Sequence, residues 1–107
     1  MSDYTPREVA ELHSRGEIEL IDVRQPEERD AGRIAGDSFI ELGELAQRAE
    51  SIPRERQIVF YCRSGSRSGM AAEAFRRAGY DAHNLEGGLL EWVAQRLPLE
   101  PSDGYVA

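Results

Sequence analysis

The chain has 107 residues, enough for one domain with its own hydrophobic core. Apolar residues make up 40% and charged residues 31%, a balance that excludes a disordered chain, and the longest apolar run is too short to span a membrane. The formal net charge of −7 argues against nucleic-acid and anionic-membrane partners, because phosphate groups are bound by basic surfaces.

The hydrophobic pattern alternates between helical and strand periodicity. The first helix has the clearest start, because Thr5 can cap it, Pro6 fits its first turn, and Glu8 completes a capping box. In chain order, the first half of the sequence predicts a helix at 5–16, a strand at 19–23, a loop at 24–37, a weaker strand at 38–40 and a short helix at 43–50.

The second half contains the strand with the strongest signal. Residues 58–61 are all apolar, which is typical of the centre of a parallel sheet that is covered on both faces. The alternation of strands and helices predicts an α/β fold, a mainly parallel central sheet flanked by helices on both faces. We expect one domain over 1–107, with its core at about 4–97. The later elements expected are a helix at 67–78, a strand at 81–85, a helix at 89–97 and a C-terminal tail at 98–107.

The N-terminal residues and the cysteine content indicate the cellular compartment. The first ten residues are polar and acidic, without the basic start and apolar stretch of a secretory signal. A single unpaired cysteine agrees with a reducing compartment, so we expect a cytoplasmic protein. His13 and His83 are not close in sequence to other potential ligands, and we expect no metal.

Cys62, the only thiol, directly follows the strand at 58–61. This places it at the carboxyl edge of the sheet, where α/β folds bind ligands. The next residues form a turn into the helix at 67–78, whose positive dipole end faces the turn. A positive environment lowers the pKa of a thiol and stabilises the reactive thiolate. We therefore expect Cys62 to be a catalytic nucleophile that needs no separate general base.

The rest of this turn can bind an anion beside the thiolate. Its glycine allows several backbone N–H groups to point inward, its two arginines add positive charge, and its three serines add hydroxyl donors. The expected substrate-binding residues are Arg63, Ser64, Gly65, Ser66, Arg67 and Ser68. Asp22 and Arg24 end an earlier strand, and we expect them to support the site through a salt bridge, with Glu28 a candidate partner of Arg24.

The stretch 62–68 resembles the active-site loop of the rhodanese family of sulfurtransferases. Two other stretches resemble signatures of this family in the right order, one at 20–36 and one at 85–88 followed by Trp92. The resemblance as a whole covers residues 20–97, nearly the whole domain. The family pattern is not followed at Arg33, Asp37 and Glu41.

The resemblance implies a single rhodanese-like domain with sulfurtransferase activity and no cofactor. Cys62 would take the outer sulfur of thiosulfate or of a related small sulfur-containing anion. It would then carry that sulfur as a persulfide to an acceptor such as cyanide, a small thiol or a protein thiol.

Other functions stay open as alternatives. Related phosphatases have a longer spacing between cysteine and arginine than the four residues between Cys62 and Arg67, so a phosphatase or an arsenate reductase is disfavoured. A reductase that forms an internal disulfide is excluded, because it needs a second cysteine. Rhodanese-like domains without the cysteine serve as docking units, so a binding or sulfur-relay module is the alternative from another class.

Overall fold

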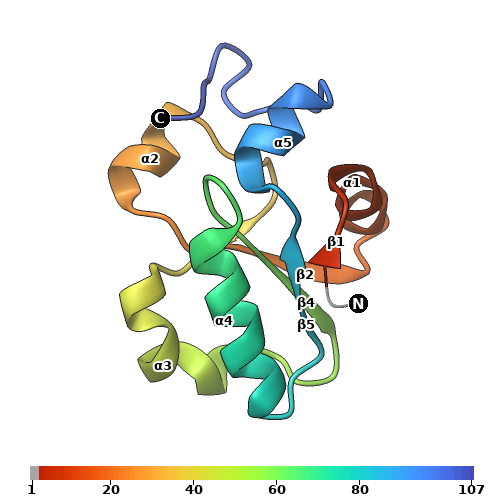
Figure 1. Cartoon of the computed structure of the whole chain (residues 1–107), viewed down its shortest axis with the longest axis vertical. Coiled ribbons are helices and arrows are strands. Elements are labelled where there is room, and N and C mark those ends of the chain that lie inside the picture. Colours follow the sequence, from red (N-terminus) through yellow and green to blue (C-terminus); the bar gives the residue numbers. More distant parts are fainter. Residues whose placement is uncertain (1–2) are drawn as a thin grey trace.

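The computed structural model describes residues 3–107 and has a five-stranded sheet at its centre (Figure 1). The strand order is β1-β5-β4-β2-β3, and all neighbouring strands pair in parallel. The strands are β1 (Asp3–Tyr4), β2 (Ile18–Asp22), β3 (Ser38–Phe39), β4 (Gln57–Tyr61) and β5 (Ala82–Leu85). The expected α/β fold is confirmed, and β4 is the middle strand, as its apolar sequence indicated.

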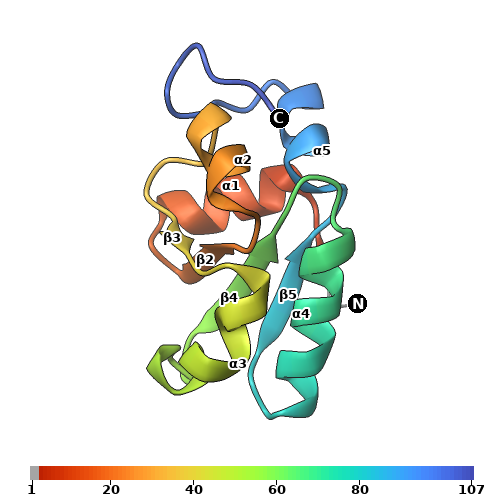
Figure 2. The ribbon, with the colours of Figure 1, turned by 90° about the vertical axis from the view of Figure 1, so that its left-hand side faces the viewer.

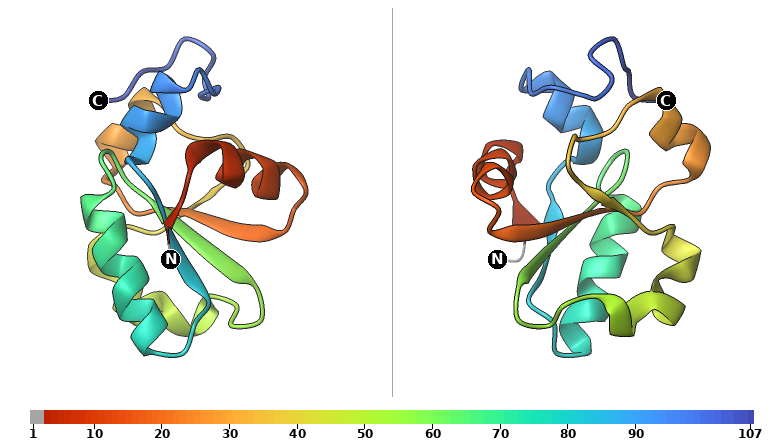
Figure 3. Two further views of the ribbon diagram at one scale, coloured as in Figure 1. Left: turned by 45° about the vertical axis from the view of Figure 1, so that its right-hand side comes forward. Right: turned by 180° about the vertical axis from the view of Figure 1, so that it is seen from behind.

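Helices cover both faces of this sheet (Figure 3). One face packs against α3 (Leu45–Arg48) and α4 (Ser66–Arg77), and the other against α1 (Pro6–Ser14) and α5 (Gly88–Ala94). Within residues 3–107, no helix has the length and apolar character needed to cross a membrane.

The central strand β4 contributes to both cores. Successive side chains of a strand point to opposite faces of the sheet. Ile58 and Phe60 accordingly pack in the core under α3 and α4, whereas Val59 and Tyr61 pack in the core under α1 and α5. Because both faces of β4 are buried, the position of Cys62 at its end is firmly determined.

The segment 24–37, expected as a loop, contains a helix, α2 (Pro26–Ala31). Pro26 occupies the first helical position, and Glu28 Oε1 accepts a hydrogen bond of 3.0 Å from the Gln25 N–H. The same kind of start signal was recognised at Thr5. The prediction failed here because α2 has no buried residue and so lacks an apolar stripe.

Two further elements differ from the prediction. The expected helix at 43–50 is divided, because 3-10 helices at Leu42–Glu44 and Ala49–Ser51 flank the short α3. Strand β1, which pairs with β5, was not predicted because its two residues are too few to show a periodicity.

The C-terminal segment packs against α2 instead of extending from the domain (Figure 2). Helix α5 ends at Ala94, so it is shorter than the helix expected at 89–97. The Arg33 N–H donates to the Glu100 carbonyl at 3.0 Å, and the Glu100 N–H donates to the Arg33 carbonyl at 2.7 Å. The Tyr105 N–H donates to the Ala31 carbonyl at 2.9 Å. The segment 98–107 is therefore held against α2 and the residues that follow it.

Candidate active site

The Cys62 loop connects the end of β4 to the start of α4. Gly65, directly before α4, has a φ of +97°, in the left-handed region that favours glycine. At the start of α5, the Leu89 N–H donates to the Cys62 carbonyl at 2.9 Å, and the Leu90 N–H donates to the Arg63 carbonyl at 3.0 Å. The starts of two helices thus hold the loop in place.

Gly88 brings α5 close to this loop. A Cβ atom at Gly88 would lie 2.5 Å from the Arg63 carbonyl oxygen and 2.7 Å from the Gly65 nitrogen, and its φ is +64°. Both the contact and the backbone angle require glycine at this position. The Gly87–Gly88 pair therefore makes a tight turn beside the Cys62 loop.

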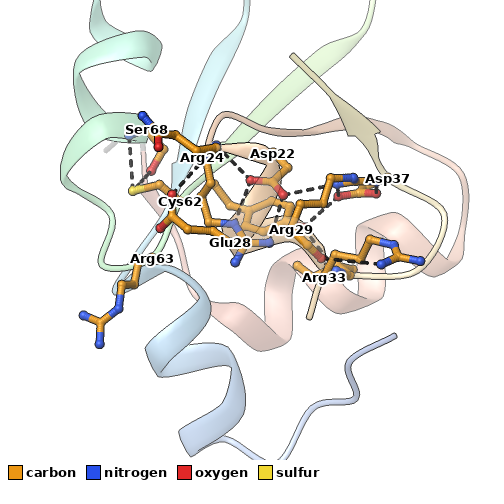
Figure 4. Close-up of polar contacts among 12 residues, drawn as sticks. Asp22, Arg24, Glu28, Arg29, Arg33, Asp37, Cys62, Arg63 and Ser68 are labelled. Atoms are coloured by element: carbon orange, nitrogen blue, oxygen red, sulfur yellow. Dashed lines mark hydrogen bonds and ion pairs between the residues drawn. The ribbon is translucent and has the colours of Figure 1, made fainter. Parts of the chain in front are cut away.

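Hydrogen-bond donors of the loop surround the sulfur of Cys62, and Figure 4 shows Ser68 beside it. Three of these donors are the Gly65 N–H at 3.1 Å, the Ser68 N–H at 3.4 Å and the Ser68 hydroxyl at 3.3 Å. Cys62 and Ser68 are both fully buried. Burial by itself raises the pKa of the Cys62 thiol, but the bonds from Ser68, Gly65 and the Ser64 N–H outweigh it, so the pKa lies below its ordinary value. The loop thus stabilises a thiolate with donors rather than with a base.

The three serines of the loop are not equivalent. The Ser64 and Ser66 side chains are exposed, whereas Ser68 is buried beneath the loop. Only Ser68 brings its hydroxyl to Cys62 Sγ among the described residues. Ser68 was predicted to bind the substrate, but in the structure its hydroxyl contacts the thiol of Cys62. The substrate-binding role of Ser68 stays a prediction.

Asn84 on β5 is a site residue that the sequence analysis did not identify. Its Nδ2 donates to the Gly65 carbonyl at 3.1 Å, and its Oδ1 accepts a 2.6 Å hydrogen bond from the Ser68 hydroxyl. The residue is only 7% exposed. A polar side chain in a buried strand was the one signal for it, because buried polar groups need partners.

Both arginines of the loop have partners in the protein. Arg67 donates two hydrogen bonds to the Glu28 carboxylate, at 2.8 and 2.9 Å, and this contact lowers the pKa of Glu28 to about 2. Arg63 extends away from the sulfur (Figure 4), and its Nε donates to an Ala107 oxygen at 2.9 Å. We expected Glu28 to be a candidate partner of Arg24, but its carboxylate pairs with Arg67 instead. The role of both arginines in attracting an anion stays a prediction.

Asp22 and Arg24 form the expected salt bridge, and it belongs to a larger buried network. Arg24 Nε and Nη2 each donate to Asp22 at 2.9 Å. Arg29 donates to Asp22 at 3.1 Å and to Asp37 at 2.7 and 2.8 Å, and the Tyr61 hydroxyl donates to Asp37 at 2.7 Å. Asp22 and Arg24 are fully buried. The network fixes the end of β2 beside the Cys62 loop.

This network also explains a departure from the rhodanese pattern. Asp37 stands where that family usually has a small apolar residue, and here it pairs with Arg29. Arg33, at another departing position, pairs with Glu100 at 3.3 Å and so helps to hold the C-terminal segment. Across residues 3–107, no group of three or more histidine, cysteine, aspartate or glutamate residues is placed to hold a metal ion.

Comparisons with known proteins agree with this geometry. The family model described as "Rhodanese-like domain" matches residues 5–95. A "Sulfurtransferase" of Allochromatium vinosum is 34% identical over 89 residues, which cover 82% of this chain and 83% of that protein. A "rhodanese-related protein" of Thermoplasma volcanium has a crystal structure with a TM-score of 0.86 and 25% identity, covering 92% of this chain and 97% of that one.

Other relatives are much longer than this chain. The "Probable adenylyltransferase/sulfurtransferase MoeZ" of Mycobacterium tuberculosis is 39% identical over 101 residues. The match covers 91% of this chain but only 26% of that protein. This chain therefore corresponds to about a quarter of that relative.

Proposed function

This chain belongs to the rhodanese-like domain family, and we propose that it is a sulfurtransferase that carries sulfane sulfur on Cys62. The observation that carries the proposal is the set of donors at Cys62 Sγ, two from backbone N–H groups and one from the Ser68 hydroxyl. Such donors stabilise an anionic sulfur without supplying a proton to a leaving group. A sulfite ion leaves without a proton, so this environment suits sulfur transfer.

In the first step, the Cys62 thiolate attacks the outer sulfur of a sulfane donor such as thiosulfate. A bond forms between Sγ and that sulfur, the sulfur–sulfur bond of the donor breaks, and sulfite leaves with the bonding electron pair. One negative charge then resides on the persulfide, and the charges balance without a proton. The backbone N–H groups of the loop are the donors for the persulfide charge.

In the second step, an acceptor anion such as cyanide or a thiolate attacks the outer sulfur. The bond to Sγ breaks, and Cys62 returns as a thiolate with the electron pair. A covalent intermediate that is formed by one substrate and consumed by another predicts ping-pong kinetics. The acceptor can be a small molecule or a protein thiol.

The closed geometry of the site supports a sulfur atom as the transferred group. Cys62 is fully buried, and Arg67 is held by Glu28 at the side of the loop. A phosphoryl group carries three oxygens that must all be bound around the sulfur, whereas a sulfane sulfur is a single atom. A phosphatase is therefore disfavoured.

The test is the intact mass of the protein after incubation with thiosulfate. We expect a gain of one sulfur atom that cyanide or a thiol removes, and we expect no gain in Cys62→Ser. Reversal by cyanide or a thiol matters, because oxidation to sulfinic acid gives a similar mass that these reagents do not remove. If neither thiosulfate nor any other sulfane donor loads Cys62, the proposal fails, and a binding module becomes the better interpretation.

A further inference from the structure

The hydrogen bonds of Asn84 determine which way the Ser68 hydroxyl can point. The Gly65 carbonyl can only accept, so the group of Asn84 that faces it at 3.1 Å must be the Nδ2 donor. The other end of the amide, Oδ1, then faces Ser68 at 2.6 Å and can only accept. Ser68 must therefore donate its hydroxyl proton to make this contact.

The same hydroxyl also faces Cys62. Its oxygen lies 3.3 Å from Sγ, and Ser68 is fully buried. A serine hydroxyl has one proton, so it can serve Asn84 Oδ1 or Cys62 Sγ at any moment, but not both. The structure thus contains one donor and two acceptors in a buried position, where an unmade hydrogen bond is expensive.

The two acceptors differ in how they change during sulfur transfer. Asn84 Oδ1 is the same neutral acceptor throughout. Cys62 Sγ is a charged acceptor in the free thiolate, and a weak one once it is bonded to a second sulfur that carries the charge. Hydrogen bonds to charged acceptors are stronger than bonds to neutral ones.

Resting on the proposed sulfur transfer, we infer that Asn84 is a positioning residue that shares the Ser68 hydroxyl with Cys62. The hydroxyl donates to Sγ when Cys62 is a free thiolate, and it turns to Asn84 Oδ1 when Cys62 carries sulfur. Asn84 thereby supplies the loaded state with a hydrogen bond that the free state does not need. Its effect is to keep the two states close in free energy, so that Cys62 can be both loaded and discharged.

The test measures the ratio of loaded to free Cys62 by intact mass at fixed concentrations of thiosulfate and sulfite. In Asn84→Leu, the hydroxyl has no good acceptor in the loaded state, and we expect this ratio to fall about tenfold. In a Ser68→Ala background the hydroxyl is absent, so Asn84→Leu is expected to change the ratio less than about twofold. Ser51→Ala removes an exposed serine hydroxyl that donates to the Arg48 carbonyl, and it controls for the loss of a serine hydroxyl outside the site.

Titration of the thiol gives a second measurement that needs no sulfur donor. The ultraviolet absorbance of the thiolate reports the pKa of Cys62, with Cys62→Ser as the blank. Asn84→Leu commits the hydroxyl to Sγ and is expected to lower this pKa. Asn84→Ala also removes the acceptor toward Ser68, is expected to shift the pKa in the same direction, and serves if Asn84→Leu does not fold. In the Ser68→Ala background neither substitution is expected to change the pKa.

The outcomes separate this inference from the proposed function. If the loaded ratio falls equally with and without the Ser68 hydroxyl, Asn84 acts by holding the Gly65 carbonyl, and the inference is wrong. An unchanged ratio and an unchanged thiol pKa in Asn84→Leu overturn it as well. If the unaltered protein takes up no sulfur, the proposed function fails, whereas a fall in the thiol pKa in Asn84→Leu that vanishes in the Ser68→Ala background would still show the shared hydroxyl.

Discussion

The segments that follow β2 and β4 lie at the same edge of the sheet and both contain arginine, but they use charge in opposite ways. At the end of β2 and just after it, Asp22 and Arg24 neutralise each other in the buried network with Arg29 and Asp37. After β4, the sulfur of Cys62 is surrounded by donors and has no cationic side chain hydrogen-bonded to it among the described residues. The first segment holds paired charges, whereas the second directs hydrogen-bond donors at the thiol.

The difference follows from what burial allows. A charged side chain without water must have a charged partner, and the network after β2 supplies one for each charge. Backbone N–H groups are neutral dipoles, so they can be directed at a buried thiol at a lower energetic penalty. Chemistry is therefore expected in the β4 segment and stability in the β2 segment, and four predictions test this division.

The largest expected effect is on activity, from the β4 segment. Cys62→Ser removes the atom that bonds to sulfur, and sulfur transfer should fall at least about 1,000-fold. The midpoint of thermal unfolding should change little, because serine is smaller and retains a polar atom near the donors. Turnover of thiosulfate to thiocyanate, together with circular dichroism, checks both expectations. Substantial turnover by the serine variant would exclude Cys62 as the sulfur carrier.

The next largest effect is on stability, from the β2 segment. Asp22→Asn leaves the fully buried Arg24 without its charged partner, which should cost about 3 kcal/mol in the free energy of unfolding. Urea denaturation measures this loss. The control is Glu11→Gln, which breaks an exposed pair with Arg15 and should cost less than about 0.5 kcal/mol. Equal losses in both variants would contradict the special role of the buried network.

A smaller effect is expected on donor affinity, at the pair that joins the two segments. Arg67→Ala removes a positive charge beside the loop and exposes the Glu28 carboxylate, so the KM for thiosulfate should rise about fivefold. Glu28→Gln frees the positive charge of Arg67 and should lower this KM. Steady-state kinetics at low ionic strength checks both signs. If neither KM changes, Arg67 holds the loop in place and does not bind the donor.

The smallest effect is on the acid stability of this same pair. The pKa of Glu28 falls from 4.5 in the unfolded chain to about 2 in the fold, because it accepts hydrogen bonds from Arg67. The stabilisation is fully present above pH 4.5 and is lost as the pH falls toward 2. The pair is partly exposed, so the loss should not exceed about 1 kcal/mol. Urea denaturation across this pH range should show a weaker pH dependence in Glu28→Gln than in the unaltered protein.

Local sequence was a sufficient guide to several features that depend on neighbouring residues. The apolar stretch 58–61 predicted the central strand. The residues that follow it predicted that Cys62 lies in a turn between this strand and a helix. The salt bridge between Asp22 and Arg24 was also predicted, because these residues are two positions apart in the chain. The start of α2 is marked by Pro26, but the helix was not predicted because it lacks an apolar stripe.

Contacts between distant segments were decided only by the tertiary structure. Arg67 and Glu28 are 39 positions apart, and Ser68 and Asn84 are 16 apart. Which carboxylate binds which arginine, and which hydroxyl reaches the thiol, depends on the order in which the strands pair. The sequence determined a parallel α/β domain with one thiol at a sheet edge, because periodicity and turn chemistry act over a few residues. The fold alone decided which side chains share that thiol, because they reach it from separate strands.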